Sequence, residues 1–361
     1  MVKVGLVGLG KMGVSHFSIV SSHPDVQTHV CDSSGLVLDM VGRYTDAPTW
    51  RDFDEMMAEA KLDALIVATP SRVHGPMVRK ALEQGVHVFC EKPFSLDWRE
   101  SEELARLAEA KGLVNQVGYH YRYVGAFQEM KRLVEAGAIG EVTHVLAEAY
   151  GPVVLKPKGT TWRTDRAAGG GCLYDYAAHP INLVNWCFGL PAHVTGTLLN
   201  SIYSAETDDE VYSTFVYEGG LSVQLSVNWS DESYRKMSAK VSLTGTRGRI
   251  TADRQEIQVY MREPVAALPE YQQGWNVKYT TELTEPVRFY LRGEEYSAQI
   301  DDFVEAVKGG PRKSLNDFAS AAETDRTIAL MLDDAERERV AAPELVRQAP
   351  ARKRGWFGLA R

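Results

Sequence analysis

The chain has 361 residues, which is enough for two domains that each bury a hydrophobic core. Hydrophobic residues make up 44% of it and charged residues 24%, and its net charge of −8 at pH 7 argues against nucleic acid, which needs a basic face. It holds no apolar run of about 18 residues, so we expect no membrane partner. The four cysteines show no C-x-x-C spacing, and we expect reduced thiols in a cytoplasmic protein without a signal peptide.

Strand-like and helix-like segments alternate over the first third of the chain. Apolar runs of strand length lie at residues 3–7, 27–31, 64–67, 86–90 and 114–117. Helix-like patterns lie at residues 12–21, 52–60, 73–83 and 98–111. This alternation predicts right-handed βαβ units and a parallel sheet, and we expect a Rossmann domain over residues 1–119.

A glycine-rich turn follows the first predicted strand and opens the first predicted helix. Gly8, Gly10 and Gly13 form the pattern G-x-G-x-x-G, with Lys11 and Met12 inside it. In this context the first glycine permits a sharp turn, the second lets a pyrophosphate approach the backbone, and the third allows close packing of helix on strand. The turn therefore predicts a dinucleotide site, in preference to an ordinary surface turn.

Asp32 ends the second apolar run, where a carboxylate can accept hydrogen bonds from ribose hydroxyls. It would repel a 2′-phosphate, and the next three residues, Ser33, Ser34 and Gly35, supply no positive charge. The sequence therefore predicts NAD as the cofactor, with NADP disfavoured.

Two tripeptides follow the ends of later strands. Residues 69–71 (Thr-Pro-Ser) and 91–93 (Glu-Lys-Pro) are expected at the cofactor cleft, because ligands of such folds bind beyond the carboxyl ends of the strands. Lys92 could hold a substrate hydroxyl there and tune its proton. An ordinary surface lysine is the alternative.

The second part of the chain has a different pattern. Helices are expected at residues 125–136, within 173–188, and at 296–308 and 318–332. Alternating runs lie at residues 142–150, 193–199, 210–217, 221–229 and 239–244, with a hairpin at 218–220. They predict a large, mostly antiparallel sheet with helices on one face, in an α+β domain over residues 120–340. The other face could be solvated or form an interface, and we expect a homodimer or homotetramer. Residues 341–361 form a basic tail, either solvated or a binding element.

Three glycines at residues 169–171 precede a segment rich in polar side chains. Asp175 and His179 are four residues apart and would share a helix face, with Asn182 three residues further on. An imidazole beside a carboxylate suits alcohol oxidation, in which a hydroxyl proton leaves as hydride moves to nicotinamide. An ordinary helix-stabilising pair or two metal ligands are the alternatives, but no third His or Cys lies nearby, so we predict no metal.

Together these segments resemble the Gfo/Idh/MocA oxidoreductases of sugars and polyols, such as glucose-fructose oxidoreductase and inositol dehydrogenase, over nearly the whole chain. The resemblance is carried by residues 8–13 with His16, 68–71 with His74, 81–85, 91–93, 118–123, 137–142, 162–163 and 169–182. It implies a Rossmann domain followed by a mixed domain with a large open sheet. It also implies that His179 is the acid/base, that Lys92 orients and polarises the reacting hydroxyl, and that Asp175 binds substrate or steers His179.

The resemblance also assigns the binding positions. Those implied for the cofactor are Gly8, Gly10, Lys11, Met12, Gly13, Asp32, Thr69, Pro70, Ser71, His74, Glu91 and Lys92. Those implied for the substrate are Tyr119, Arg122, Trp162, Arg163, Asp175 and Asn182. The chain departs from the family pattern at Asn182, where many members carry Asp, at Ala177, where glycine is common, and at Ser71, where asparagine is common.

Positively charged residues of one loop could bind an anionic group of the substrate. Lys156, Lys158, Arg163 and Arg166 precede the three glycines and could meet a phosphate, a uronate or a nucleotide-sugar diphosphate. Solvated loop charge is the alternative.

The sequence therefore predicts an NAD-dependent oxidoreductase that interconverts a secondary alcohol of a sugar, polyol or sugar derivative with its ketone. One alternative is a redox-neutral enzyme with tightly held NAD, for instance one that cleaves a glycoside through a transient ketone. The other is a non-catalytic dinucleotide-binding sensor. For the dehydrogenase, we expect alcohol oxidation to rise with pH through a group that titrates near or above neutrality, namely His179.

Overall fold

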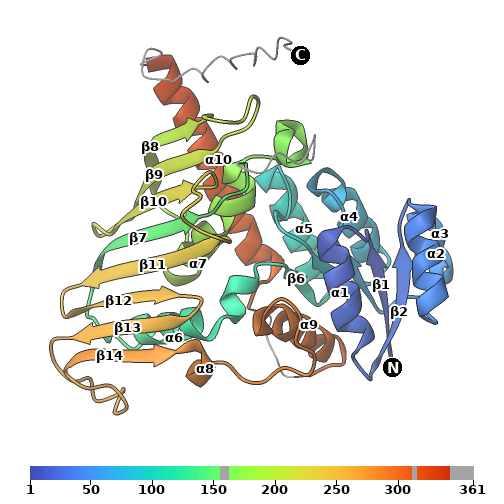
Figure 1. The fold of residues 1–361 in the computed structure, drawn as a ribbon, viewed down its shortest axis with the longest axis horizontal. Coiled ribbons are helices and arrows are strands. Elements are labelled where there is room, and N and C mark those ends of the chain that lie inside the picture. Colours follow the sequence, from blue (N-terminus) through green and yellow to red (C-terminus); the bar gives the residue numbers. More distant parts are fainter. Residues whose placement is uncertain (155–161, 311–314, 342–361) are drawn as a thin grey trace, which may run out of the picture.

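A computed structural model of the chain describes residues 1–154, 162–310 and 315–341. Figure 1 shows two sheets next to each other, each with helices against it. No helix among these described residues is long and apolar enough to cross a membrane. The four cysteines are free thiols; Cys187 is half-buried and the other three are buried.

The first sheet has six strands in the order β3-β2-β1-β4-β5-β6, and every pairing in it is parallel. Its strands are β1 (Val2–Val7), β2 (Val26–Cys31), β3 (Thr49–Trp50), β4 (Ala64–Val67), β5 (His87–Cys90) and β6 (Asn115–Val117). The crossover helices are α1 (Lys11–Ser21), α2 (Gly35–Tyr44), α3 (Phe53–Glu59), α4 (His74–Glu83) and α5 (Trp98–Ala110). The expected Rossmann architecture is confirmed.

The sequence analysis predicts neither α2 nor β3. Helix α2 fully buries only Leu38, with Val37 and Val41 partly buried against the same core, while Leu36 and Met40 stay exposed, so apolar residues stand on both sides of the helix and blur the pattern. Strand β3 has two residues, too few for a periodic pattern. Strand β3 forms by pairing with β2, and α2 packs on β3, so both depend on contacts outside their own sequence.

The second sheet has eight strands in the order β14-β13-β12-β11-β7-β10-β9-β8. They are β7 (Val142–Tyr150), β8 (His193–Asn200), β9 (Glu210–Val216), β10 (Ser222–Asn228), β11 (Ser238–Gly245), β12 (Gly248–Asp253), β13 (Glu256–Met261) and β14 (Gly274–Tyr279). All pairings are antiparallel except that of β7 with β10. The predicted hairpin joins β9 and β10, where Gly219 and Gly220 take φ values of 85° and 94° that suit glycine.

Helices cover one face of this sheet and reach back to the first domain. Those on the sheet are α6 (Gly125–Glu135), α7 (Ala178–Phe188), α8 (Thr280–Leu283) and α10 (Phe318–Ala341), whereas α9 (Glu294–Val307) packs on α1 of the first domain. Helix α10 packs on both α5 of the first domain and α7 and β8 of the second, and Figure 1 shows it running behind the large sheet.

Helix α9 belongs structurally to the first domain. Its Ile300, Phe303 and Val304 join the hydrophobic cluster that contains Leu6 and Phe89 of the parallel sheet. A single boundary at residue 119 therefore does not describe the packing, because the chain returns to the Rossmann core after it has completed the large sheet. Such a return cannot be read from the order of elements along the sequence.

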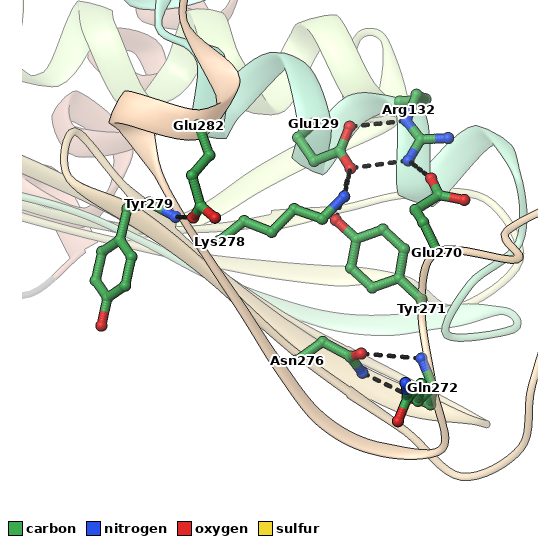
Figure 2. A network of polar contacts seen from close by, with 9 residues as sticks. All are labelled: Glu129, Arg132, Glu270, Tyr271, Gln272, Asn276, Lys278, Tyr279 and Glu282. Atoms are coloured by element: carbon green, nitrogen blue, oxygen red, sulfur yellow. Dashed lines mark hydrogen bonds and ion pairs between the residues drawn. The ribbon is translucent and has the colours of Figure 1, made fainter.

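A polar cluster fastens the β14 edge of the large sheet to α6 (Figure 2). Glu129 of α6 accepts hydrogen bonds from Arg132 at 2.7 and 2.8 Å and from the Tyr271 hydroxyl at 2.6 Å. Lys278 of β14 lies 3.5 Å from the same carboxylate, and Arg132 also pairs with Glu270. Burial raises the pKa of Glu129, but the hydrogen bonds from Arg132 and Tyr271 outweigh it and lower that pKa to about 2.

Glu129→Gln is expected to lower the free energy of unfolding at neutral pH by about 2–3 kcal/mol, the scale of hydrogen bonds to a buried charge. Because the pKa of Glu129 is lowered on folding, its contribution is present above the ordinary value of 4.5 and is lost as pH falls toward 2. Urea unfolding at neutral and acidic pH measures both effects. The matched control is Glu135→Gln on the same helix, because Glu135 is 62% exposed in its pair with Lys131. Equal losses in the two variants would contradict this assignment.

Candidate active site

The glycine-rich turn forms an open cradle between β1 and α1. Gly8 has a φ of 90°, and a Cβ on Gly13 would collide with the carbonyl oxygen of Gly8. A Cβ built on Gly10 meets nothing within 4 Å, so the surface above it is open. Lys11 and Met12 begin α1 next to this surface. The turn thus fits a pyrophosphate, which needs bare backbone and free N–H groups at a helix start.

Asp32 braces the same turn from the end of β2. Its Oδ2 accepts a hydrogen bond from the main-chain N–H of Leu9 at 2.6 Å, and its Oδ1 accepts one from Ser34 at 2.8 Å. Each carboxylate oxygen has two lone pairs, so both can still accept a ribose hydroxyl. The structure therefore places Asp32 beside the cradle, where the sequence predicts it.

His74 connects the loops that follow β4 and β5. Its ring nitrogens lie 2.9 Å from the main-chain oxygen of Thr69 and 3.0 Å from that of Pro93. Burial lowers the pKa of His74, and a neutral ring donates only one hydrogen bond at a time. Pro70 and Ser71 lie in the same first loop. His74 thus bridges these two loops, with both ring nitrogens facing main-chain oxygens.

The carboxylate of Glu91 turns into the domain instead of into the cleft. Its Oε1 lies 2.6 Å from Nε2 of His16, with side chains 10% and 0% exposed, and its Oε2 accepts the N–H of Lys92. Burial raises the pKa of Glu91, but the His16 contact and the nearby charges outweigh it and lower that pKa. A Cβ on Gly118 would collide with this carboxylate. Glu91 thus links α1 to the loop that carries Lys92.

Lys92 and Asp175 meet across the two domains. The Nζ atom of Lys92 donates to Oδ1 and to the main-chain oxygen of Asp175, both at 2.8 Å, and the side chains are 12% and 8% exposed. The Nε atom of Arg163 donates to Oδ2 of Asp175 at 2.8 Å. Burial raises the pKa of Asp175, but the charges of Lys92 and Arg163 outweigh it and lower that pKa to about 2. Asp175 is therefore an anion held by two cations.

The helix that carries Asp175 begins with an unexpected turn. Residues Leu173–Ala177 form a π-helical turn, and α7 continues from Ala178. Both carboxylate oxygens of Asp175 bond to Lys92 and Arg163, so the helix-stabilising pair of Asp175 with His179, left open by the sequence, is not formed. Such turns occur often at functional sites, because the wider turn redirects side chains.

His179 lies in a cluster of aromatic rings. Its ring packs edge-on against those of Tyr119, His120 and Tyr121, with centroids 6.1, 5.0 and 5.1 Å away. Its Nδ1 is buried and has no partner among the described residues. Nε2 is therefore the nitrogen that can exchange a proton with a ligand. Burial, and then the charges of Lys92 and His120, lower the pKa of His179 well below its ordinary 6.5. Both causes favour the neutral imidazole, which is the opposite direction to the titration near or above neutrality expected from the sequence.

Arg122 and Asn182 hydrogen-bond to each other inside the second domain. Arg122 donates from Nε to Oδ1 of Asn182 at 2.7 Å and also to its main-chain oxygen, and it reaches the Leu315 oxygen. The amide nitrogen of Asn182 donates to Thr324. Both side chains are at most 2% exposed, so in this arrangement both serve packing.

The remaining predicted substrate residues differ in exposure. Tyr119 is 1% exposed, and its hydroxyl is buried with no partner in the described part of the chain. Trp162 is 36% exposed, with the Arg163 guanidinium 4.6 Å from its ring centre. Arg163 is one of the loop cations from which the sequence predicts an anionic substrate. Its pairing with Asp175 already neutralises that charge. Lys156 and Lys158 lie outside the described residues.

Local sequence patterns do not identify His120 and Tyr296 as neighbours of the site. The two rings stack at 4.3 Å, and the Tyr296 hydroxyl lies 3.2 Å from Nε2 of His120. They stand 176 residues apart, so no local spacing connects them. The only available signal was the position of His120 within the 118–123 segment.

Potential metal ligands gather elsewhere. Within the described ranges, His23, Asp25 and Glu305 form such a group, and the ammonium of Lys308 already lies 2.6 and 2.9 Å from its two carboxylates. Asp175 and His179 belong to no such group there. A metal-free reaction therefore stays a prediction.

Two domain matches place the chain in a family. Residues 2–119 match the oxidoreductase family's NAD-binding Rossmann fold, and residues 127–251 match the GFO/IDH/MocA C-terminal domain. The chain thus belongs to the Gfo/Idh/MocA oxidoreductases, as the sequence analysis predicts, and its first domain is an NAD-binding Rossmann domain.

Relatives and solved structures agree with this assignment. An uncharacterised oxidoreductase of Schizosaccharomyces pombe is 30% identical over 202 residues, 55% of this chain and 55% of that protein. The match therefore spans about half the length of that relative. The scyllo-inositol 2-dehydrogenase (NAD⁺) of Bacillus subtilis is 25% identical over 342 residues, which cover 91% of this chain and 92% of that protein. The structure of GenD2 from gentamicin A biosynthesis, in complex with NAD, is 26% identical, covers 94% and 95% of the two chains and has a TM-score of 0.75.

Proposed function

We propose that the protein is an NAD-dependent dehydrogenase that interconverts a secondary alcohol of a sugar, polyol or sugar derivative with its ketone. The observation that carries the proposal is the pairing of Lys92 of the nucleotide domain with Asp175 of the second domain, near the buried ring of His179. The named activity of the Bacillus subtilis relative, which aligns over 91% of this chain, supports the substrate class.

Lys92 supplies the contact that orients the substrate. An ammonium group has three donors, and two of those of Lys92 bond to Asp175. The third can donate to the oxygen of a substrate hydroxyl. That contact stabilises the developing alkoxide, while Asp175 fixes the direction of the amine.

His179 supplies the proton acceptor. A neutral imidazole can take the hydroxyl proton at Nε2, and the burial that lowers the pKa of His179 favours this neutral form. The Gly8–Gly13 turn would hold NAD⁺, which when bound would supply the acceptor for the hydride of the carbinol carbon. In the reverse direction His179 returns the proton to the ketone oxygen. The aromatic cluster around His179 excludes water from Nδ1.

The pH dependence follows from the lowered pKa of His179. We expect kcat/KM for alcohol oxidation to rise with pH through a midpoint below the ordinary histidine value of 6.5 and to be flat with respect to this group at neutral pH. Initial rates across acidic and neutral buffers measure the profile. A limb centred at or above neutrality that disappears on substitution of His179 would contradict the assignment.

Turnover of free NADH with a panel of keto-sugars and keto-inositols tests the reaction itself. A dehydrogenase consumes added NADH in proportion to the alcohol formed. Release of nicotinamide on denaturation, without turnover of added cofactor, would instead favour the redox-neutral enzyme. Binding of cofactor with neither reaction would favour the sensor. The homodimer or homotetramer stays a prediction, which sedimentation of the purified chain would test.

A further inference from the structure

Arg51 lies at the same edge of the parallel sheet as the nucleotide cradle. Strands β2 and β3 pair in parallel, with Cys31 opposite Trp50, and the N–H of Asp32 donates to the Trp50 oxygen at 3.2 Å. Arg51 follows Trp50 directly. Because the carboxyl ends of parallel strands share one edge, Asp32 and Arg51 leave the sheet side by side.

The side chain of Arg51 reaches toward the turn that follows Asp32. Its guanidinium lies against the backbone of Gly35, so closely that a Cβ on Gly35 would collide with its Nη2. Arg51 is exposed, and among residues 1–154, 162–310 and 315–341 its guanidinium has no ion pair or hydrogen bond. A free guanidinium therefore stands against the turn that follows the carboxylate predicted to select against a 2′-phosphate.

These two charges oppose each other in cofactor choice. The carboxylate of Asp32 repels a phosphomonoester on the ribose, whereas a guanidinium offers it two parallel N–H donors. In dinucleotide-binding folds an arginine near the acidic position accommodates the 2′-phosphate of NADP. We propose that Arg51 binds this 2′-phosphate, so that the cradle takes NADP as well as NAD and Arg51 sets the ratio between them.

The inference rests on the NAD-binding domain and not on the proposed reaction. The residues that directly follow Asp32 include no arginine, and Arg51 comes instead from the end of the neighbouring strand. NAD stays the tighter ligand, since Asp32 remains an anion at the ribose. Arg51 changes the ratio between the affinities for NAD and NADP, which would be large if Asp32 acted alone.

Binding of NADH and NADPH to the whole chain, measured by calorimetry without substrate, tests the proposal. These two ligands differ only in the 2′-phosphate. We expect the parent to bind NADPH within about tenfold of NADH. Arg51→Gln should weaken NADPH at least tenfold, or about 1.4 kcal/mol, and change the NADH Kd less than twofold. The matched control is Arg43→Gln, an exposed arginine in the last turn of α2, which should change neither.

A second variant separates the roles of the two charges. Asp32→Asn should tighten NADPH about tenfold, by removing one like-charge contact, and adding Arg51→Gln should cancel that gain. Equal weakening of both cofactors by Arg51→Gln, or an unchanged NADPH Kd, would overturn the proposal. These results do not depend on turnover. A chain that binds NADPH through Arg51 and reduces no ketone would refute only the proposed reaction.

Discussion

Replacing His179 with alanine, or Lys92 with alanine, is expected to lower kcat for alcohol oxidation about 10²- to 10⁴-fold, or roughly 3–5 kcal/mol of barrier. His179 would no longer take the hydroxyl proton, and without Lys92 the developing alkoxide would lose its donor. The affinity for NAD should stay within about twofold, because neither side chain contacts the glycine-rich turn. Steady-state kinetics and NADH binding on the same samples measure both quantities.

His29→Ala is the matched control for this experiment. His29 is also a buried histidine, 6% exposed, but it lies on β2 and neither ring nitrogen has a partner among the described residues. It should keep kcat near the parent value even if it changes the melting temperature. If His179→Ala folds normally and turns over substrate near the parent rate, His179 is not the acid/base.

Asp175→Ala should lower kcat/KM by about 10²- to 10³-fold, through both a lower kcat and a higher KM. The carboxylate holds Lys92 and Arg163 at 2.8 Å each. Its loss leaves two partly buried cations without a counter-ion and frees the amine of Lys92 to rotate. Arg163→Gln is the comparison, because it removes only the outer partner, which is 38% exposed.

The comparison distinguishes two roles of Asp175. If it acts by aiming Lys92, Arg163→Gln should cost less than tenfold in kcat/KM, and Asp175→Asn should recover part of the loss by keeping one oxygen acceptor. If Asp175→Ala changes only the free energy of unfolding, with unaltered kcat/KM in the folded fraction, its place in the site is purely structural.

Local motifs accounted for the cofactor cradle and much of the fold. The glycine turn, Asp32 and the strand-end tripeptides all act within a few residues of a strand end, so their spacing predicts their position. The same holds for β7, whose alternation over residues 142–150 matches the observed strand. Strands β12 to β14 were missed, because their alternating side chains include charged residues and β14 exposes Trp275 and Val277 at the sheet edge.

Long-range contacts decided the rest. The sequence places Glu91 and His74 at the cofactor cleft, but the fold turns the first toward His16 and engages both ring nitrogens of the second. Arg122 and Asn182, expected at the substrate, instead pair with each other across 60 residues. A π-helical turn separates Asp175 from His179, which a regular helix would have stacked. The spacing of residues along the sequence does not predict these contacts, because each depends on which partner the fold brings close to the buried side chain.

The measurement that tests the account most directly follows the hydride itself. Once the panel yields an alcohol substrate, the same alcohol carrying deuterium on its carbinol carbon is incubated with the parent chain and added NAD⁺. The account predicts one deuterium on the nicotinamide ring of the free reduced cofactor for each ketone formed, and a rate that His179→Ala and Lys92→Ala both reduce by about 10² or more. Consumption of the alcohol with no deuterium on added cofactor would contradict it.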